Sequence, residues 1–356
     1  KGITLSRQSL NELTLEHVKR DNIKLEVYTN LQRRFNDQDV PVYCEMILGL
    51  PGETYESWVE GVEKLMVTGL KNQIFMYHCQ VYENTELADP HYREKHGIQT
   101  RRIVADIIHA ATQRKGWVPE YEETVVATNT LNQEDWRRAA IFSWTTMLMH
   151  SMKTGFFVMG YLKDRFDINH TDFIRHLSEL NMRPGIGGMI RKEIARYNQQ
   201  LDQILDGKGR GSYSQEYGEI YWELEEMSFL EISKDLERFY IEFGEIITDY
   251  LDQRNVTHDP DELLEAVTYQ RLRIPGRMPM AQRCHNFRFN FPEYFEKRLS
   301  TAPITLKLDA QTMEIIETDF GGDSERYARQ IILWGRKSGL VTTDVRWGPA
   351  AVKTTA

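Results

Sequence analysis

Polar side chains with complementary hydrogen-bonding groups lie near the ends of two predicted strands. Residues 3–9 read as a β-strand, and residues 40–48 form a nearly continuous apolar run typical of one. Successive side chains of a strand point to opposite faces. Ser6 and Gln8 therefore share one face of the first strand, and Glu45 lies on one face of the second. If the two strands are neighbours, the amide of Gln8 and the carboxylate of Glu45 lie side by side. Such a pair suits the two hydroxyls of a ribose.

The elements that would position these side chains alternate between strands and helices. Residues 40–48 form a nearly continuous apolar run, as expected for a strand covered on both faces. The turn at residues 49–52 is followed by Thr54, which predicts a helix N-cap. We expect strands at 3–9, 40–48 and 73–81, and helices at 13–35 and after Thr54. Short links between such elements indicate parallel strands with right-handed crossovers, so this region is expected to be a piece of a larger α/β sheet.

The sequence changes character from about residue 97 onward. A short strand is expected at 123–130, and Asn132 with Asp135 three positions later predicts the start of a helix. Helical patterns then dominate to about residue 267. The glycine-rich basic loop at 207–211 could cradle a phosphate, but it does not follow a strand and is interpreted as a plain flexible loop. The last section shows strand-like alternation at 286–291 and 304–308 and a predicted helix at 324–334.

Four short motifs, in matching order and spacing, carry a resemblance to a known family. Residues 45–54 read EMILGLPGET, which resembles the fifth barrel strand of radical S-adenosylmethionine (SAM) enzymes. Residues 4–10 (TLSRQSL) look like their fourth strand, and residues 18–20 (VKR) resemble the arginine at the end of the helix that follows. Residues 81–87 (VYENTEL) resemble the end of their sixth strand. The resemblance implies that residues 1–100 form the C-terminal half of a partial (β/α) radical SAM barrel.

The resemblance also implies roles for individual residues. In radical SAM enzymes the positions matching Gln8 and Glu45 contact the ribose of SAM. The residue matching Arg20 pairs with the SAM carboxylate, a task that suits the planar fork of arginine donors. The glycine turn brings bare backbone close to the cofactor, and the backbone around the third strand's end would flank the adenine. The implied cofactor-binding residues are Ser6, Gln8, Arg20, Glu45, Gly49, Gly52, His78 and Cys79.

Each of these residues also has a purely structural explanation, and the sequence leaves both open. Glu45 could be a buried carboxylate paired with a neighbouring barrel residue, and Gln8 could be a hydrogen-bonded structural amide. Arg20 could be an exposed charge at the end of a helix, where the helix dipole favours it. His78 could be an ordinary core histidine, which is the commoner role for this residue type. The sequence identifies no catalytic residue.

The cysteines provide no ligand set for an iron–sulfur cluster. Cys44, Cys79 and Cys284 are far apart in sequence, and each is interpreted as a small core residue. The C-x3-C-x2-C motif of radical SAM enzymes, which supplies three thiolates to a [4Fe–4S] cluster, is not in this sequence. No metal ligand is therefore assigned. Because the chain also opens inside an apparent strand, we expect it to be a C-terminal fragment, with the cluster and cobalamin bound only in the intact protein.

A weaker resemblance continues beyond the expected barrel. Residues 123–136 (ETVVATNTLNQEDW) and 331–336 (IILWGR) look like parts of the C-terminal extension of radical SAM proteins that carry a cobalamin domain. We expect a mostly helical extension at 101–270 and a small mixed α/β end at 271–356. The resemblance implies that the intact enzyme cleaves SAM reductively and transfers a methyl group, with cobalamin, to an unactivated carbon or phosphorus. A cobalamin-independent radical SAM oxidase or methylthiotransferase, and a non-catalytic α/β binding module, stay open.

Composition narrows the range of partners. The formal charge is −9, and the interspersed acidic and basic residues lack the basic stripe of a nucleic-acid binder. The apolar window at 139–162 includes His150 and Lys153, so it is interpreted as a buried core helix and not as a membrane span. Three lone thiols suit a reducing, cytoplasmic compartment. The expected partners are a small-molecule substrate and an electron donor such as flavodoxin or ferredoxin.

Overall fold

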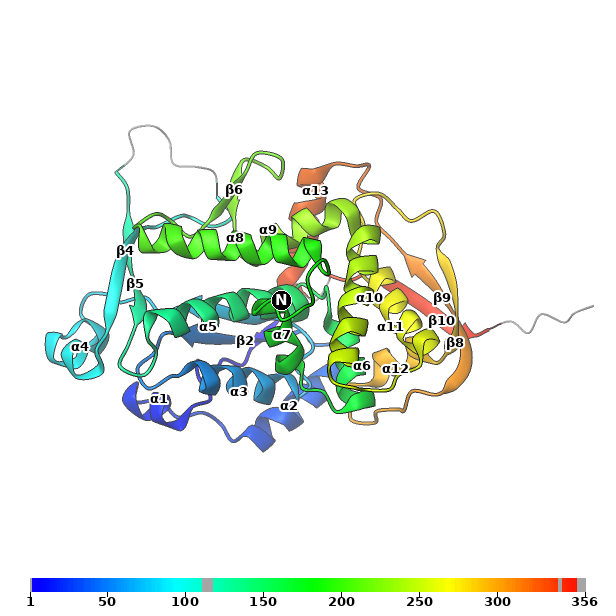
Figure 1. Cartoon of the computed structure of the whole chain (residues 1–356), viewed down its shortest axis with the longest axis horizontal. Coiled ribbons are helices and arrows are strands. Elements are labelled where there is room, and N and C mark those ends of the chain that lie inside the picture. The colour runs from blue at the N-terminus through cyan, green and yellow to red at the C-terminus, as the bar shows by residue number, and fades with distance from the viewer. Residues whose placement is uncertain (1, 111–117, 339–340, 351–356) are drawn as a thin grey trace, which may run out of the picture.

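The computed structural model describes residues 2–110, 118–338 and 341–350, and it shows a mixed α/β protein (Figure 1). Its first sheet has three parallel strands in the order β1-β2-β3, which confirms the parallel pairing expected from the sequence. These strands are β1 (Ile3–Thr4), β2 (Val42–Leu48) and β3 (Ile74–His78).

The first strand is shorter than the sequence predicts. The prediction covers residues 3–9, whereas β1 ends at Thr4 and the chain returns to β2 only through a single bridge between Gln8 and Met46. Gln8 has a φ of 57°, a left-handed conformation that a continuous strand excludes. The Gln8 N–H still donates to the Glu45 carbonyl at 3.0 Å, and the Gln8 carbonyl accepts from the Ile47 N–H at 2.9 Å. Gln8 therefore stays beside β2 although the strand is interrupted.

The helix predicted over residues 13–35 is two helices, α1 (Glu12–His17) and α2 (Leu25–Asp37). Lys19 has a φ of 53°, and a residue in this left-handed conformation ends a helix in the same way as a C-terminal glycine. The link between the helices contains Arg20. The prediction of one continuous helix is thus wrong, and the interruption lets the chain turn at Arg20 above the end of the sheet.

Helix α3 (Tyr55–Met66) begins where the sequence predicts and covers one face of the sheet. The Thr54 hydroxyl accepts from the Ser57 N–H at 3.1 Å, and the Ser57 hydroxyl accepts from the Thr54 N–H at 2.9 Å. A Cβ atom added to Gly61 of α3 would lie 3.8 Å from the Cε atom of Met46. Met46 and its face of β2 therefore point toward α3.

An antiparallel hairpin extends the sheet beyond β3. It consists of β4 (Gln99–Val104) and β5 (Tyr121–Ala127), with α4 (Pro90–His96) before it. The Val81 N–H donates to the Glu123 carbonyl at 2.8 Å, and the Val125 N–H donates to the Cys79 carbonyl at 2.9 Å. The predicted strand at 123–130 thus corresponds to β5, which lies alongside the chain that leaves β3.

Helices dominate the middle of the chain. Asn132 begins the first of them as predicted, because its side chain accepts from the Asp135 N–H at 2.9 Å. A short hairpin of β6 (Ser212–Ser214) and β7 (Ile220–Trp222) interrupts the helical region. The helices are α5 (Gln133–Thr146), α6 (Phe156–Phe166), α7 (His170–Ser178), α8 (Gly188–Leu205), α9 (Leu224–Ile232), α10 (Leu236–Gln253) and α11 (Pro260–Leu272).

The apolar window at 139–162 is buried, but it is not one helix. Helix α5 ends in a wide π-helical turn over Met147–Ser151, and α6 starts only after Lys153, whose φ is 66°. The left-handed residue breaks the helix that the apolar composition suggests. No helix in the described ranges has both the length and the apolar composition that a membrane span requires.

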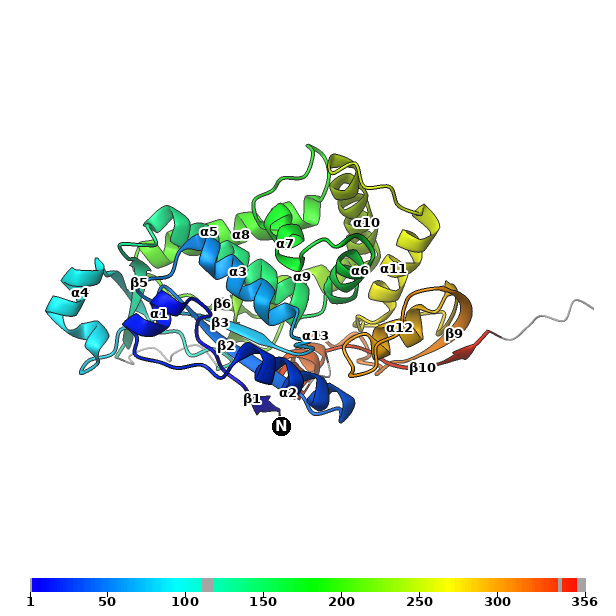
Figure 2. The ribbon, with the colours of Figure 1, turned by 90° about the horizontal axis from the view of Figure 1, so that it is seen from below.

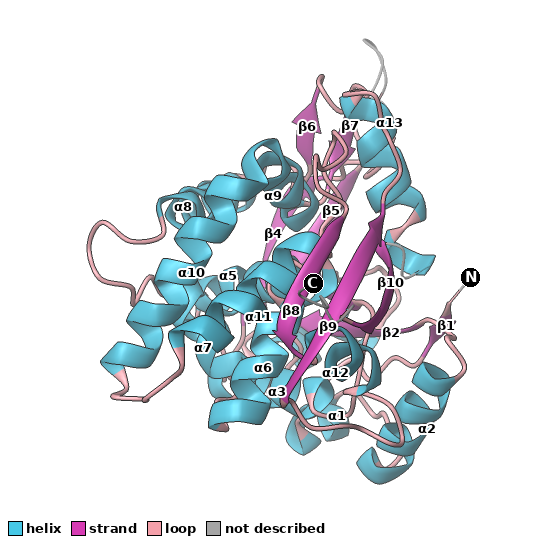
Figure 3. Cartoon of the chain, turned by 90° about the vertical axis from the view of Figure 1, so that its right-hand side faces the viewer, coloured by secondary structure: helices cyan, strands magenta, loops and turns pink. Residues whose placement is uncertain are grey.

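A three-stranded antiparallel sheet, in the order β10-β9-β8, forms the last part of the chain (Figure 3). Its elements are β8 (Cys284–Phe289), α12 (Phe291–Lys297), β9 (Leu308–Ile316), α13 (Ser324–Ala328), a π-helical turn at Arg329–Trp334, a 3-10 turn at Arg336–Ser338, and β10 (Asp344–Pro349). The predicted strand at 286–291 overlaps β8, but the one at 304–308 is wrong except at Leu308. The Asn290 side chain instead holds this stretch, accepting from the Lys307 N–H at 2.7 Å and donating to the Thr305 carbonyl at 3.1 Å.

One hydrophobic cluster runs through the molecule, from Tyr28 of α2 to Val341 near the C-terminus. Figure 2 shows α3 and α5 over the same side of the first sheet. The indole N–H of Trp58 in α3 donates to the Ser143 hydroxyl of α5 at 3.0 Å, which joins the two helices inside this cluster. The division into segments at 1–100, 101–270 and 271–356 stays a prediction.

A buried histidine predicts how folding stability depends on pH. His150 lies 2% exposed in the π-helical turn, its Nε2 is 3.0 Å from the Leu70 carbonyl, and its Nδ1 has no partner in the described structure. Burial, together with the nearby charge of Lys153, lowers the pKa of His150 well below its ordinary value. The unfolded chain therefore takes up a proton below about pH 6.5 that the folded chain does not, and stability falls as pH decreases.

We expect the free energy of unfolding of the His150→Gln variant to fall less between pH 7 and pH 5 than that of the wild type. The glutamine amide keeps a donor for the Leu70 carbonyl but has no proton to gain. The difference should approach about 1.4 kcal/mol per pH unit below pH 6, measured by urea denaturation. His91→Gln, at an exposed histidine, is the control and should leave the slope unchanged. Equal slopes in all three proteins would contradict the prediction.

Candidate functional site

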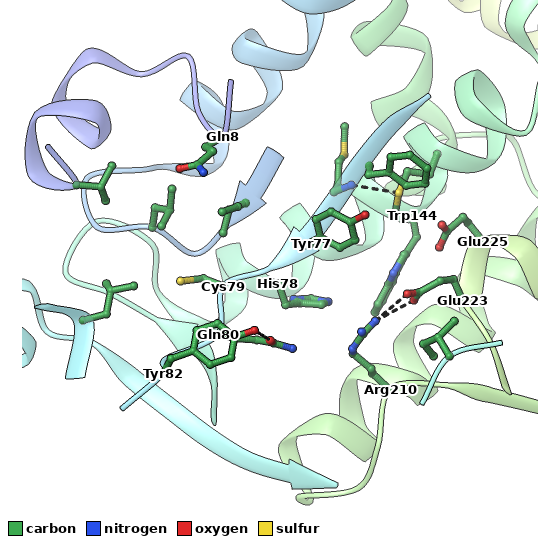
Figure 4. A pocket seen from close by; sticks show the side chains of 18 of the residues that line it. Gln8, Tyr77, His78, Cys79, Gln80, Tyr82, Trp144, Arg210, Glu223 and Glu225 are labelled. Atoms are coloured by element: carbon green, nitrogen blue, oxygen red, sulfur yellow. Dashed lines mark hydrogen bonds and ion pairs between the residues drawn. The ribbon is translucent and has the colours of Figure 1, made fainter. Parts of the chain in front are cut away.

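A cavity of about 830 Å³ opens around the carboxyl end of β3 (Figure 4). Its walls come from β2, β3, the π-helical turn after α5, the loop before β6, α9 and the segment around Arg336. The volume lies in the upper part of the range of small-molecule pockets. Parallel α/β sheets bind ligands at the carboxyl ends of their strands, so this is the expected place for a site.

The alternation of β2 shows which of its residues face the cavity side of the sheet. Cys44, Met46 and Leu48 are buried on the side that α3 covers, whereas Tyr43, Glu45 and Ile47 are half-buried on the other. Ile47 lines the cavity, and so do Phe75 and Tyr77, the residues of β3 that pair with Glu45 and Ile47. Glu45 therefore lies on the cavity face of the sheet, turned away from α3.

The structure brings Ser6, Gln8 and Glu45 together, with Ser6 as the direct partner of the carboxylate. The Ser6 hydroxyl donates to Glu45 Oε2 at 2.8 Å. The Gln8 side chain lines the cavity and has no hydrogen-bond partner in the described part of the chain. Glu45 itself is not among the residues that line the cavity. The backbone bonds between Gln8 and β2 nevertheless hold the amide beside the strand that carries Glu45.

Arg20 lines the cavity, whereas the two glycines of the turn at residues 49–52 do not. Arg20 is exposed and lines the cavity at its mouth. Gly49 and Gly52 do not line the cavity. Gly52 has a φ of +96°, and a Cβ atom there would lie 3.1 Å from the Thr14 nitrogen, so this glycine lets α1 approach the turn. Its closest neighbours thus belong to α1.

His78 and Cys79 both line the cavity at the end of β3. The His78 ring lies 5.5 Å from the rings of Trp136 and Trp144, and its Nδ1 is buried without a partner in the described residues. Burial, helped by the charge of Arg210, lowers the pKa of His78 to about 3, so the ring is neutral at physiological pH. Burial raises the pKa of Cys79 to about 12, so it is a thiol and not a thiolate.

The sequence did not predict the charged wall at the other end of the cavity. Arg336 is 3% exposed, and its Nη1 and Nη2 atoms donate to Glu226 Oε1 and Glu225 Oε1, both at 2.6 Å. Its Nε donates to Gln73 Oε1 at 2.9 Å. His109 Nε2 lies 2.7 Å from Glu226 Oε2. The motif at residues 331–336 carries a family resemblance, but nothing local in it indicates partners more than a hundred residues away.

The pKa values of Glu225 and Glu226 shift in opposite directions because the two carboxylates have different hydrogen-bond partners. Burial alone would raise the pKa of Glu226, but Arg336 and His109 together lower it below the usual range. Burial raises the pKa of Glu225, and Arg336 offsets only part of this effect. Both oxygens of Glu226 accept hydrogen bonds, whereas one oxygen of Glu225 has no partner among the described residues.

The basic loop at 207–211 brings a second arginine to the same wall. Arg210 Nη1 donates to both oxygens of Glu223, at 3.0 and 2.9 Å, and its Nε donates to Glu122 Oε1 at 3.3 Å. The Gly211 N–H donates to Asp106 Oδ2 at 2.8 Å. The arginine of this loop is thus occupied by carboxylates.

The chain's own residues do not fit an iron–sulfur cluster. Cys44 and Cys79 are buried in and beside the first sheet, and Cys284 is exposed on β8. Over the described ranges, no three side chains of the types His, Cys, Asp and Glu are grouped as a metal site. A [4Fe–4S] cluster would need thiolates from elsewhere.

Replacing Arg336 should destabilise the fold strongly. We expect Arg336→Met to lower the free energy of unfolding by about 3–5 kcal/mol in urea denaturation, because Glu225 and Glu226 would stay buried without their cation. Arg329→Met is the matched control, since Arg329 pairs with Glu325 in a partly exposed i,i+4 arrangement. That pair should contribute less than about 1 kcal/mol. If Arg336→Met and Arg329→Met lower the free energy of unfolding equally, burial of the ion pair is not the cause of the destabilisation.

Two curated relatives resemble this chain, whereas no protein-family model matches it. The first is the 2-(S-pantetheinyl)-carbapenam-3-carboxylate methyltransferase of Streptantibioticus cattleyicolor. It is 26% identical over an alignment that covers 93% of this chain and 50% of that protein. The second is the cobalamin-dependent radical SAM methyltransferase TokK of Streptomyces tokunonensis, 25% identical over 83% of this chain and 44% of that protein.

The chain thus spans about half the length of the curated relatives it matches. The alignments cover most of this chain. The resemblance to cobalamin-binding radical SAM proteins that the motifs predict is confirmed.

Proposed function

We propose that this chain carries the SAM-binding edge and the substrate cavity of a radical SAM methyltransferase. The observation that carries this proposal is the cavity at the carboxyl end of β3, which brings four of the implied cofactor-binding residues to one space. These residues are Gln8, Arg20, His78 and Cys79. The names of both relatives include methyltransferase, which supports transfer of a methyl group as the reaction.

Unsatisfied polar atoms in the cavity support a polar ligand such as SAM. The amide of Gln8 has no hydrogen-bond partner among the described residues, and His78 Nδ1 is buried and unpaired there. Gln8 is half-buried and lines the cavity, and a buried polar atom such as His78 Nδ1 is normally hydrogen-bonded, so both groups are candidates for contacts with a bound molecule. Two hydroxyls and an adenine ring supply donors and acceptors of the required kind.

The chain's residues would hold SAM from one side. Gln8 and Glu45 would bind the ribose, with Ser6 fixing the Glu45 carboxylate by the hydrogen bond already present. Arg20 at the mouth would pair with the carboxylate of SAM, because a guanidinium offers planar donors to such a group. The backbone around His78 and Cys79 would flank the adenine.

The remaining parts of the activity would come from the rest of the protein. We propose that the three parallel strands are one half of a partial (β/α) barrel, and that the cluster binds to the other half. When bound, SAM and cobalamin supply the radical and the methyl group. The buried walls of this chain would exclude water and orient the substrate. Cobalamin dependence rests on the name of TokK alone. A flavodoxin or ferredoxin as electron donor, and a cytoplasmic location, are part of the same proposal.

Binding of a non-reactive SAM analogue tests this proposal. In the protein produced from its complete gene, we expect Glu45→Gln to weaken S-adenosylhomocysteine binding about tenfold to hundredfold in isothermal titration calorimetry. Gln8→Ala should weaken it less, because a hydrogen bond to a charged acceptor contributes about 1.5–3 kcal/mol and one to a neutral group about 1.

The control removes a carboxylate charge from an exposed helix instead of the sheet. Glu16 is exposed on α1, so Glu16→Gln should bind the analogue like the wild type. Unchanged affinity in both Glu45→Gln and Gln8→Ala would exclude the ribose contacts and, with them, the proposed orientation of SAM.

A further inference from the structure

At the end of the cavity away from Gln8, a buried carboxylate oxygen has no partner among the residues that the structure describes. Glu225 of α9 is 2% exposed and lines the cavity. Its Oε1 accepts from Arg336 at 2.6 Å, whereas its Oε2 is buried and has no hydrogen bond within the part of the chain that the structure describes. Figure 4 shows Gln8 and Glu225 at opposite sides of the view, with Tyr77 and His78 between them.

The neighbouring glutamates of the wall do not share this property. Both oxygens of Glu223 accept from Arg210. Glu226 accepts from Arg336 at one oxygen, and its other oxygen is 2.7 Å from His109 and 3.0 Å from the Glu223 N–H. Of these three glutamates on the cavity wall, only Glu225 has an oxygen available to a ligand. A buried acceptor without a donor is costly, so the arrangement is better explained by a ligand than by packing.

We infer that the Glu225 end of the cavity is the substrate subsite, and that the free oxygen of Glu225 accepts a hydrogen bond from an N–H or O–H group of the substrate. This inference rests on the proposed function, in which SAM occupies the end near Gln8 and Arg20. A substrate held between Glu225 and the centre of the cavity would lie next to the cofactor and not in its place.

The walls around Glu225 define the rest of the ligand. Trp144, Met147 and Phe75 line the same cavity and offer apolar surface. Each nitrogen of Arg336 already donates to Glu225, Glu226 or Gln73, so an anion would have to compete with two buried carboxylates for this cation. Burial raises the pKa of Glu225, and a donor placed on its free oxygen would bring that pKa down again. The subsite therefore suits a molecule with an apolar body and an amide, ammonium or hydroxyl donor.

Two probes of nearly the same shape test the hydrogen bond directly. N-methylbenzamide has an N–H donor, and methyl benzoate replaces it with an oxygen. Both are titrated by ligand-observed NMR into the protein produced from its complete gene. We expect the amide to bind at least tenfold more tightly than the ester. Benzylamine and benzyl alcohol, compared with toluene, tell whether an ammonium or a hydroxyl is preferred as the donor.

The variant Glu225→Gln should abolish or reverse the preference for the amide. Its side-chain oxygen can stay with Arg336, and its NH₂ group would then face the cavity as a donor. Glu86→Gln is the matched control, because Glu86 also lines the cavity but is exposed and pairs with Lys19. If Glu225→Gln does not fold, the ratio of the amide and ester affinities measured on the wild type still tests the inference. Equal binding of amide and ester to the wild type, or an unchanged ratio in Glu225→Gln, overturns the inference.

S-adenosylhomocysteine separates this inference from the proposed function. If both are correct, the analogue and N-methylbenzamide bind together, and neither changes the affinity of the other by more than about threefold. Full competition between them would overturn the separate subsite while leaving SAM binding intact. A preserved preference for the amide, with no binding of the analogue, would overturn the proposed function and support the donor site.

Discussion

The guanidinium of Arg336 donates to Glu225 and Glu226 of α9 and to Gln73, the residue that directly precedes β3. These bonds join the C-terminal segment, the helical region and the parallel sheet at one buried point. A buried ion pair is not a large net source of stability, because desolvation opposes the attraction. Burying any one of these charged groups without its partners is costly, however, so the interaction disfavours arrangements in which one of them is missing. The cavity wall can therefore form only when all three parts are in place.

The same interaction determines the polarity of the cavity. Arg336 and Arg210 each bind two carboxylates, so both cations of this wall are paired with acidic side chains of the protein. Among the carboxylates Glu223, Glu225 and Glu226 of this wall, the oxygen left for a ligand is Glu225 Oε2, and apolar side chains lie in the same cavity. The opposite end, by contrast, presents the exposed charge of Arg20 and the amide of Gln8, which has no partner in the described ranges of the chain. The two ends thus suit different groups, and a cofactor and a substrate can be distinguished by position.

Local sequence signals predicted the parts of the fold that depend on neighbours in the chain. The apolar run of β2, the cap at Thr54 and the cap at Asn132 are each determined by a few consecutive residues. Several of the wrong predictions lie where a residue adopts a left-handed conformation that its type does not require. Gln8 and Lys153 are such residues, and their φ values interrupt the predicted strand and the predicted helix.

The candidate site likewise has one part that local sequence signals predicted and one part that they did not. The face of Glu45 follows from strand alternation, and its position beside Ser6 and Gln8 agrees with that reasoning. The wall of Glu225, Glu226 and Arg336 could not be predicted, because a helix and a C-terminal turn meet there only in the folded chain. No periodicity or motif relates residues that are separated by more than a hundred positions.

The order in which the chain is synthesised gives the buried arginine a further consequence. Glu226 leaves the ribosome 110 residues before Arg336, which at ordinary rates of synthesis is about 6 to 22 seconds. During this interval Glu225 and Glu226 lack the arginine that accompanies them into the interior. The helix must stay in water, or its carboxylates must take up protons, until the segment with Arg336 emerges. Completion of the cavity wall is therefore a late step of folding, and a chain that stops short of Arg336 leaves this helix unburied and open to proteolysis.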